Sequence, residues 1–320
     1  SAGSLKKFPQ WNTERCDMKI KRKKKEEEAA ILYKRTAAEK VLYAFVFAVF
    51  TLYALSLILP FLWLIINSLQ DKTTYEINLV LGKTFAFPKK LDWSNYAYAF
   101  QKLTYNNTNI FGMFFNSVWY TFVRIFGGVI ASAFTGYALA KYTFRGRNVI
   151  FAVIIFSMTV PIVGTTGATF KLVNDILHIY NTPFYPILKY FSGIGMNFLV
   201  MYGFFKNISW SYAEAAFIDG ASHSKVFFKV MLPQATSAVI TLGILTGITA
   251  WNEYMDVLLY LPNFPTIASG LYGVSRTLPR EGYSTAYFAA LVISLVPVFV
   301  TFCCFSDVIM KNFAVGGLKG

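Results

Sequence analysis

Long apolar segments alternate with shorter polar segments along most of the chain. A helix that crosses a membrane needs about 20 mostly apolar residues, and six segments meet this requirement. They are residues 41–70, 112–140, 148–170, 183–205, 234–252 and 282–306. Only Arg124 and Lys189 bring charge into them, and the fourth segment has the shortest charge-free part. The pattern predicts an all-α membrane protein with six transmembrane helices in residues 41–320, after a polar tail at 1–40.

The composition agrees with a membrane protein and excludes a water-soluble enzyme. Of the 320 residues, 55% are hydrophobic and only 14% are charged, whereas soluble domains carry about 25% charged residues. The two histidines, His178 and His223, have no neighbouring Cys or His pattern, so we expect no metal site. Nor does the sequence place either histidine against a Ser or Cys nucleophile in the fold. We therefore expect no catalytic residue and no cofactor bound by this chain.

The distribution of positive charge predicts which side of the membrane each loop occupies. With six spans both ends of the chain share one side, and 20 of the 30 Lys and Arg residues fall there, against nine on the other. Because positive loops stay in the cytoplasm, we predict an N-in, C-in topology. The basic run at 19–25 can bind anionic lipid, although a solvated extension that sets the orientation is the simpler interpretation. This asymmetry explains the net charge of +14 without nucleic acid.

The inner loop at about 208–234 predicts two short helices. Ser211 and Glu214 have capping-box spacing, so the first helix should begin there. Gly220 is placed to end it in a left-handed conformation. A second helix can follow from Ser222 or Ser224, and Pro233 then precedes the fifth span. Tyr212, Phe217 and Ile218 are expected to be exposed and to give the first helix apolar contacts with another protein.

The string Glu214-Ala-Ala-Phe-Ile-Asp-Gly220, with Leu232-Pro233 after it, resembles the EAA loop of type I ATP-binding cassette (ABC) importers. In that family the loop helix sits in a groove of the ATPase subunit and transmits its closure to the transmembrane helices. The resemblance implies the type I ABC importer permease fold and a coupling surface on this helix. That surface would comprise Ser211, Tyr212, Glu214, Ala215, Ala216, Ile218, Asp219 and Gly220.

Further segments are similar to the maltose-type carbohydrate permeases, in particular to the smaller, six-helix subunit. These segments are Asn116-Ser117, Gly136-Tyr-Ala-Leu-Ala-Lys141, Phe144-Arg-Gly-Arg147, Trp251-Asn-Glu-Tyr254 and the glycine-rich tail that ends at Gly320. The resemblance implies a sister permease subunit, two cassette ATPase subunits that carry ATP and Mg, and an extracellular solute-binding protein. It also implies a multi-pass protein of the bacterial plasma membrane.

Polar residues inside the spans are the candidates for a substrate path, because membrane-embedded charge usually faces a cavity or a partner. Arg124 lies about eight residues, or ~12 Å, along a helix from Asn116. Glu253 and Asp256, near the outer end of the fifth span, are placed to pair with Arg124. We hypothesise that Arg124 and Glu253 shape the central vestibule. Trp251 and Asn252 suit sugar recognition, although an aromatic at a helix end is more often an interfacial anchor.

The last outer loop, at about 261–282, is rich in Pro and Gly and is too irregular to span the membrane. The resemblance implies that it reaches into the solute-binding protein, through a segment that includes Leu261, Gly270, Gly273 and Gly282. A plain connector is the alternative, but its length exceeds that of most connections.

Taken together, the sequence favours a carbohydrate importer permease over three other interpretations. A type I importer for a polyamine, phosphate or amino acid would share the EAA loop but not the sugar-permease segments. A stand-alone channel or ion-coupled transporter would need no ATPase contact. A membrane enzyme is least favoured, because no catalytic group of residues is found.

Overall fold

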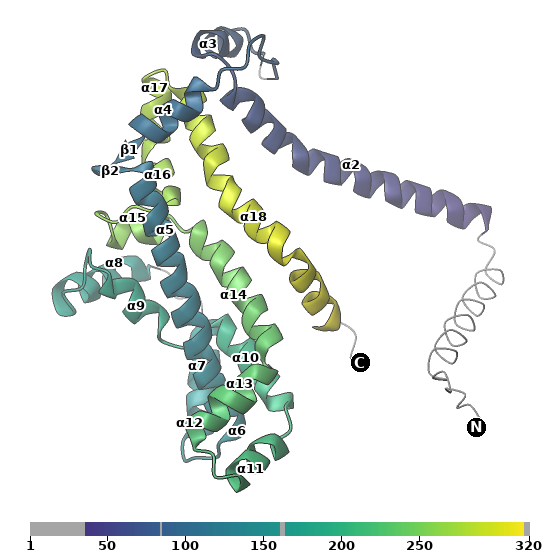
Figure 1. Cartoon of the computed structure of the whole chain (residues 1–320), viewed down its shortest axis with the longest axis vertical. Coiled ribbons are helices and arrows are strands. Elements are labelled where there is room, and N and C mark those ends of the chain that lie inside the picture. The colour runs from purple at the N-terminus through teal and green to yellow at the C-terminus, as the bar shows by residue number, and fades with distance from the viewer. Residues whose placement is uncertain (1–35, 84, 161–163, 317–320) are drawn as a thin grey trace, which may run out of the picture. The chain divides into compact units, whose positions relative to one another are not determined.

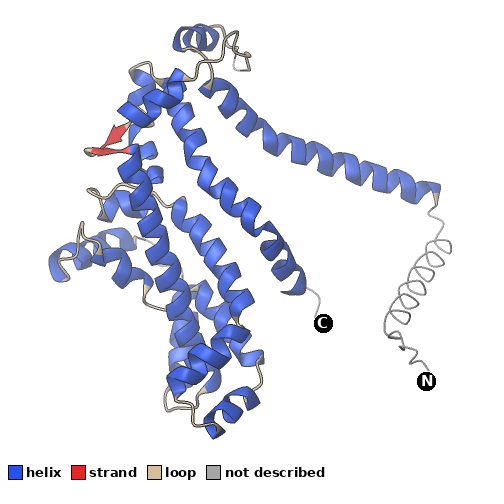
Figure 2. Ribbon diagram, in the orientation of Figure 1, coloured by secondary structure: helices blue, strands red, loops and turns tan. Residues whose placement is uncertain are grey.

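The computed structural model describes residues 36–83, 85–160 and 164–316, except for the side chains of Lys102 and of residues 307–316. The chain divides into two compact units, Ser1–Leu62 and Trp63–Gly320. Helices make up most of the described chain (Figures 1 and 2). The basic run at 19–25 and the terminal residues 317–320 lie outside the described residues.

The first described helix, α2 (Ala37–Ser68), is 32 residues long and carries its apolar side chains outward. Within the first unit nearly every described side chain is exposed, including Phe47 at 74% and Phe50 at 67%. A helix that is apolar all round and covered by no other part of its unit has the composition of a lipid-facing span. The predicted first span at 41–70 therefore matches one continuous helix, including Pro60.

The end of α2 belongs to the second unit and is held by a buried polar network. The Asn95 side chain donates to the carbonyls of Ser68, at 3.0 Å, and Gln70, at 2.8 Å. The Thr285 hydroxyl donates to the Asn95 amide oxygen at 2.8 Å. Asn95 lies on α4 (Ser94–Lys102) and Thr285 on α18 (Ser284–Gly316), and α3 (Lys72–Val80) lies between α2 and α4 in sequence. The network therefore joins three helices at one end of this unit.

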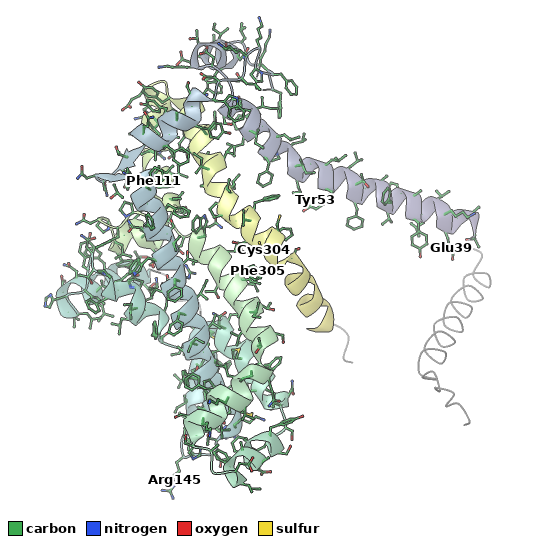
Figure 3. The ribbon with its side chains drawn as sticks, viewed as in Figure 1. Glu39, Tyr53, Phe111, Arg145, Cys304 and Phe305 are labelled. Carbon is green, nitrogen blue, oxygen red and sulfur yellow. The ribbon has the colours of Figure 1, made fainter. Side chains whose placement is uncertain are left out.

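A 32-residue helical run forms the centre of the second unit. It consists of α5 (Ile110–Ile125), a π-helical turn η1 (Phe126–Ile130) and α6 (Ala131–Lys141). A hairpin of β1 (Thr104–Tyr105) and β2 (Thr108–Asn109) leads into it, with left-handed Asn106 and Asn107 at its turn. Helix α5 packs against α14 (Thr236–Trp251), and α14 packs against α18 (Figure 1). Phe111 lies at the start of the run, and Arg145 lies in the loop just beyond its other end (Figure 3).

The close contact between α6 and α10 (Met196–Asn207) depends on a glycine. A Cβ atom added at Gly136 would lie 2.9 Å from the Tyr202 nitrogen and 3.1 Å from the Met201 carbonyl carbon. Because no side chain separates the two backbones, the helices pack closely, as small residues allow in membrane proteins. Met201 and Phe205 of α10 are fully buried beside Ala133 and Tyr137 of α6.

Three described helices are long and apolar enough to cross a membrane, namely Ala37–Ser68, Ile110–Lys141 and Ser284–Ser306. A fourth candidate is the pair His223–Gln234 and Thr236–Trp251, which is bent by 77°. The third predicted span is divided into α7 (Arg147–Thr159) and α8 (Thr165–Lys171), and the π-helical turn η2 (Leu172–Ile176) follows. The fourth is divided into α9 (Phe184–Tyr190) and α10, and Gly193 and Gly195 have positive φ between them. The helical membrane fold is confirmed, and the count of six spans stays a prediction.

Candidate functional site

The helix predicted in the inner loop is present as α11 (Ser211–Ile218), but its first turn differs from the prediction. The N-cap is Trp210, whose side chain makes no capping hydrogen bond, and the Ser209 hydroxyl accepts from the Ser211 N–H at 3.3 Å. Ser211 is already inside the helix, where its hydroxyl pairs with the Ser209 hydroxyl at 2.8 Å. The predicted capping box of Ser211 and Glu214 is therefore wrong, because Ser211 lies one residue past the capping position.

The end of α11 agrees with the prediction. Gly220 has φ +77°, the left-handed conformation that glycine adopts at no steric cost. The Gly220 N–H donates to the Phe217 carbonyl at 3.0 Å, and the Ala221 N–H donates to the Ala216 carbonyl at 2.9 Å. These two bonds form a Schellman motif, which satisfies carbonyls that a helix end leaves unpaired. The glycine stop expected from the sequence is confirmed.

The chain then turns back through short helices. Ser222 caps α12 (His223–Val226) by accepting a hydrogen bond from the Lys225 N–H at 3.4 Å, so the second helix begins as predicted. A π-helical turn η3 (Phe227–Met231) and α13 (Leu232–Gln234) follow, and the chain bends into α14. Met231 is fully buried, as is Val226, which fixes this turn against the α6 and α10 core.

Helix α11 has one buried face and one exposed face. Ala213 is fully buried in the core cluster of α6 and α10, whereas Tyr212 is 55% exposed and Ile218 86% exposed. Phe217 is half-buried, with its ring against those of Trp210 and His223 at centroid distances of 6.1 and 4.9 Å. The expectation that Phe217 is exposed is wrong, because its position on the helix turns it toward α12.

Two polar contacts fasten this loop to the end of α6. The Lys141 amine donates to the Ile208 carbonyl, just before α11. Just after α6, the Tyr142 hydroxyl pairs with Nδ1 of His223 at 2.9 Å. A movement of α11 is thereby linked to the long helical run of α5 and α6. The arrangement presents Tyr212 and Ile218 outward on a helix whose base is fixed.

A second group of polar residues surrounds Arg124 on α5. Its Nη1 atom lies 3.4 Å from Oε2 of Glu253, so the pairing of Arg124 with Glu253 that the sequence suggested is present. The guanidinium also lies over the Tyr190 ring, 5.0 Å from the centroid, in a cation–π contact. Both Arg124 and Glu253 are half-buried, with 20% and 28% of their side chains exposed.

Asp256, on α15 (Met255–Tyr260), accepts hydrogen bonds from side chains of two other helices, α5 and α9. The Tyr120 and Tyr185 hydroxyls donate at 3.0 and 2.7 Å, and the Tyr190 hydroxyl donates at 3.1 Å. The Lys189 amine lies 2.5 Å from Oδ1 of the same carboxylate. Asp256 therefore pairs with Lys189 rather than with Arg124. Lys189 stands out in the sequence as one of two charged residues in the predicted spans, but its partner is 67 residues away.

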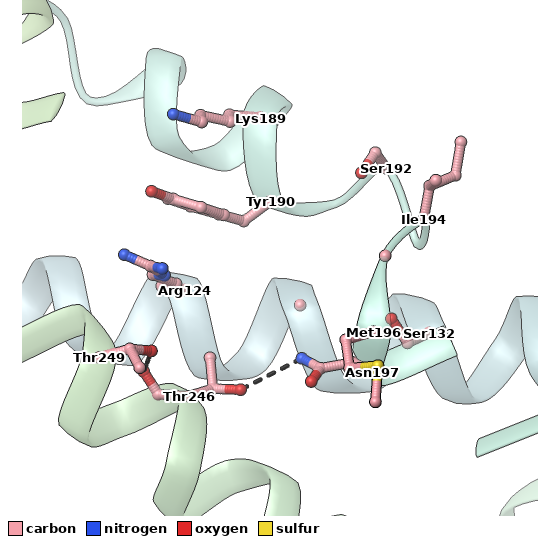
Figure 4. A pocket seen from close by; sticks show the side chains of 12 residues that line it. Arg124, Ser132, Lys189, Tyr190, Ser192, Ile194, Met196, Asn197, Thr246 and Thr249 are labelled. Atoms are coloured by element: carbon pink, nitrogen blue, oxygen red, sulfur yellow. Dashed lines mark hydrogen bonds between the residues drawn. The ribbon is translucent and has the colours of Figure 1, made fainter. Parts of the chain in front are cut away.

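Arg124 and Lys189 line a cavity of about 370 Å³ (Figure 4). Figure 4 shows Tyr190 between the two cations, and Asn197 of α10 and Thr246 of α14 on another wall. The Asn197 amide donates to the Thr246 hydroxyl at 3.1 Å. The remaining lining residues are Gly128, Ser132, Ser192, Ile194, Gly195, Met196 and Thr249. The cavity thus combines two positive charges with hydroxyl and amide groups.

The other residues proposed for the substrate path lie outside this lining. The Asn116 amide donates to the Pro265 carbonyl at 3.0 Å and so links α5 to the last outer loop. The Trp251 Nε1–H donates to the Ser294 carbonyl at 3.3 Å, and the Asn252 amide donates to the Ile248 carbonyl at 2.8 Å. Of the five residues predicted for the path, the structure brings together Arg124 and Glu253.

The last outer loop is more ordered than its composition suggested. It contains α16 (Ile267–Val274) and α17 (Thr277–Arg280) after Leu261, which is 1% exposed. Gly270 and Gly273 pack closely: a Cβ atom would lie 2.1 Å from the Met113 sulfur and 2.2 Å from the Tyr105 ring. Gly282 has φ +77° beside Lys72. A capping box of Thr266 and Ser269 begins α16.

The length and apolar composition of α2, the α5–α6 run and α18 define a helical membrane protein. A polar cavity among its helices, together with an exposed helix in a loop apart from that cavity, is typical of a transport protein rather than of a membrane anchor.

Comparison with known proteins then gives the family. Residues 128–314 match the model of the binding-protein-dependent transport system inner membrane component. The match covers more than half of the chain, so the protein belongs to this family. The resemblance to ABC importer permeases that the EAA loop indicated is thereby confirmed.

Individual relatives are similar over most of their length. A diacetylchitobiose uptake system permease protein of Streptomyces coelicolor is 28% identical, over 85% of this chain and 87% of its own. An arabinooligosaccharides transport system permease protein of Halalkalibacterium halodurans is 27% identical, over 85% and 94%. Among solved structures, a bacterial ABC transporter involved in the import of the acidic polysaccharide alginate aligns with a TM-score of 0.69. At 24% identity it covers 86% of this chain and 99% of its own, and it shows the same fold.

Proposed function

We propose that the chain is a permease subunit of an ABC importer that moves a sugar or oligosaccharide into the cell. Family membership supports the transport role, and the names of the two relatives above support a carbohydrate as the solute. The polar cavity at Arg124 adds support, because sugar hydroxyls need hydrogen-bonding partners on any path through a membrane. The chain itself would be non-catalytic, and separate cassette ATPase subunits would bind ATP and Mg.

In this proposal the chain crosses the membrane six times, with both ends in the cytoplasm. The three long helices and the bent pair supply four crossings, and the segments around α7 and α10 supply the other two. The placement of Lys and Arg residues supports the orientation. Residues 1–40 would form a basic cytoplasmic tail near membrane lipid, and residues 41–320 the permease domain in the bacterial inner membrane.

The coupling surface is the exposed face of α11. The observation that carries this assignment is the contrast between fully buried Ala213 and Ile218, which is 86% exposed on the same short helix. An apolar side chain so exposed, on a helix fixed at its base by Tyr142 and Lys141, suits a groove in another protein. Ser211, Tyr212, Glu214, Ala215, Ala216, Asp219 and Gly220 would complete the surface. ATP-driven closure of the ATPases would then shift the permease between inward-facing and outward-facing states.

The other partners follow from the same proposal. A sister permease subunit would complete the transport path, and Asn116, Arg124, Trp251, Asn252 and Glu253 would contribute to this chain's half. An extracellular solute-binding protein would deliver the sugar at the outer loop, near Leu261, Gly270, Gly273 and Gly282. The hydrogen bond from Asn116 to the Pro265 carbonyl would connect that loop with the path.

Uptake by the complete transporter tests this function. The complex of this chain with its sister permease and ATPases is placed in proteoliposomes. ATP is supplied on the side of the membrane that carries the ATPases, and the binding protein with the solute is supplied on the other side. We expect accumulation of an oligosaccharide that requires ATP and the binding protein. Uptake of a polyamine, phosphate or amino acid in place of any oligosaccharide would assign the chain to another class of importer. Uptake without ATP would contradict the importer itself.

A further inference from the structure

We propose that the cavity between Arg124 and Lys189 binds an acidic group of the transported carbohydrate, such as the carboxylate of a uronic acid. This inference rests on the proposed sugar-import function and adds the substrate's charge. Both charged residues in the lining are cations. Their carboxylate partners, Glu253 and Asp256, are not part of that lining. A ligand in the cavity therefore lies nearest to positive charge.

The two cations keep hydrogen-bond donors for a ligand. A guanidinium has five N–H donors, and the ion pair with Glu253 involves Nη1 of Arg124 at 3.4 Å. That distance is longer than the about 2.8 Å of a strong charge-assisted bond. Lys189 contacts Asp256 and the Tyr185 hydroxyl, and 42% of its side chain is exposed. A planar carboxylate matches the forked donors of arginine, so Arg124 is suited to hold it and Lys189 to add a second charge.

Tyr190 positions both cations. Arg124 lies 5.0 Å and Lys189 5.5 Å from the centroid of its ring (Figure 4). The Tyr190 hydroxyl donates to Asp256 at 3.1 Å, which fixes the ring itself. Because the ring and the carboxylates hold the two cations in place, little side-chain entropy is lost when a ligand binds. The cations are thus arranged before the substrate arrives.

The rest of the cavity suits the neutral part of a sugar. Ser132, Ser192, Asn197, Thr246 and Thr249 offer hydroxyl and amide groups to sugar hydroxyls. The volume of about 370 Å³ falls within the range of about 300–1,000 Å³ that holds small ligands. A cationic solute such as a polyamine would meet like charge at Arg124 and Lys189, which disfavours it. The lining therefore favours an anionic glycan over both a neutral and a cationic solute.

The test compares an oligogalacturonate with its carboxyl-reduced, neutral counterpart in the reconstituted complete transporter. The same binding protein is used throughout, so a change in the acid-to-neutral uptake ratio comes from the permease. We expect the ratio to fall about tenfold in Lys189→Gln, as loss of one charge-assisted hydrogen bond predicts. Lys189→Arg keeps the charge and should restore much of the ratio. Lys171→Gln, an exposed lysine outside the cavity lining, is the matched control and should leave the ratio unchanged.

Thr249→Glu is a second variant, which adds a negative charge to the lining and keeps both ion pairs. It should lower the ratio by about tenfold or more, whereas Thr249→Gln should not. A ratio unchanged in both Lys189→Gln and Thr249→Glu would overturn the inference and leave sugar import standing. Uptake of the neutral sugar but not of the acidic one by the wild-type transporter would likewise overturn the inference and leave sugar import standing. Uptake of neither sugar, together with uptake of a non-sugar solute, would overturn the proposed function instead.

Discussion

Single residues account for the polar chemistry at the centre of the second unit. Asp256 is 10% exposed, and four neighbouring side chains donate hydrogen bonds to it. A buried carboxylate is tolerated only when it is paired and hydrogen-bonded, and here both conditions are met. The tyrosines also supply the rings over which Arg124 and Lys189 lie, so the same residues hydrogen-bond the carboxylate and orient the two cations.

Gly220 allows a direct test of how α11 ends. A Cβ atom there would meet nothing within 4 Å, so any effect of substitution comes from the left-handed backbone at φ +77°. Valine in that conformation costs about 1–3 kcal/mol, while asparagine tolerates it. We expect Gly220→Val to lower ATP-driven uptake by about tenfold and Gly220→Asn to retain most of it.

Reconstituted uptake with equal amounts of each assembled variant measures this difference. Gly146 provides the control, because it is also left-handed, with φ +89°, and also has open space around its Cβ position. Gly146→Val should therefore suffer the same backbone strain without altering α11. Equal loss of uptake in the Gly146 and Gly220 valine variants would show that the end of α11 has no special role.

At the scale of elements, the close packing of α6 against α10 depends on the absence of a side chain at Gly136. Gly136→Ala would force a methyl group to 2.9 Å from the Tyr202 nitrogen, which is backbone and cannot rotate away. Gly203, on α10 itself, has open space, so alanine there should be neutral or slightly stabilising. We expect Gly136→Ala to destabilise the protein by about 1–3 kcal/mol through overpacking. Thermal unfolding of the purified complex checks the pair, and equal melting temperatures would contradict the packing argument.

Sequence patterns predicted the elements better than the contacts between them. The apolar segment 41–70 forms a single helix despite Pro60, and a glycine at the expected place ends α11. The divided segments have positive-φ glycines, Gly164 in the third and Gly193 and Gly195 in the fourth, whose conformation apolar content does not reveal. The predicted N-cap of α11 was wrong because serine is a residue type typical of N-caps, whereas Ser211 lies inside the helix.

The candidate site was predicted only in part, for a related reason. Arg124 was identified because charge inside a span is costly and therefore informative, and Glu253 because it lies near the outer end of the fifth span, within reach of Arg124. Lys189 carried the same signal, but its pairing with Asp256 joins α9 to α15, and hydropathy holds no information on which helices meet. Asn116 and Trp251 have side chains suited to sugars, yet both bind backbone carbonyls in the fold.

At the scale of the whole molecule, the proposed topology assigns each loop to one side of the membrane. Arg145 lies in the short loop after α6, which we place inside, and Arg276 lies in the last outer loop. Both side chains are exposed, so each position is suited to a cysteine probe. With Cys16, Cys303 and Cys304 replaced by serine, a membrane-impermeant thiol reagent should label Arg276→Cys in intact cells. Arg145→Cys should react only after the membrane is opened.

Labelling of Arg145→Cys but not of Arg276→Cys in intact cells would show the opposite orientation and would place α11 outside the cytoplasm. Labelling of both positions would contradict an odd number of crossings between them. The predicted result requires spans three, four and five together to place these loops on opposite sides, and so it also tests the divided helices.

The central claim is that the exposed face of α11 sits in a separate ATPase subunit, and cross-linking in the assembled complex tests it most directly. A photo-reactive phenylalanine analogue replaces Ile218, and the control position is Ile176, which is 68% exposed and lies in η2, in the loop that the proposed topology places outside. We predict that position 218 cross-links to the ATPase and position 176 does not. A complex that imports sugar with position 218 cross-linked to no ATPase subunit would contradict the account.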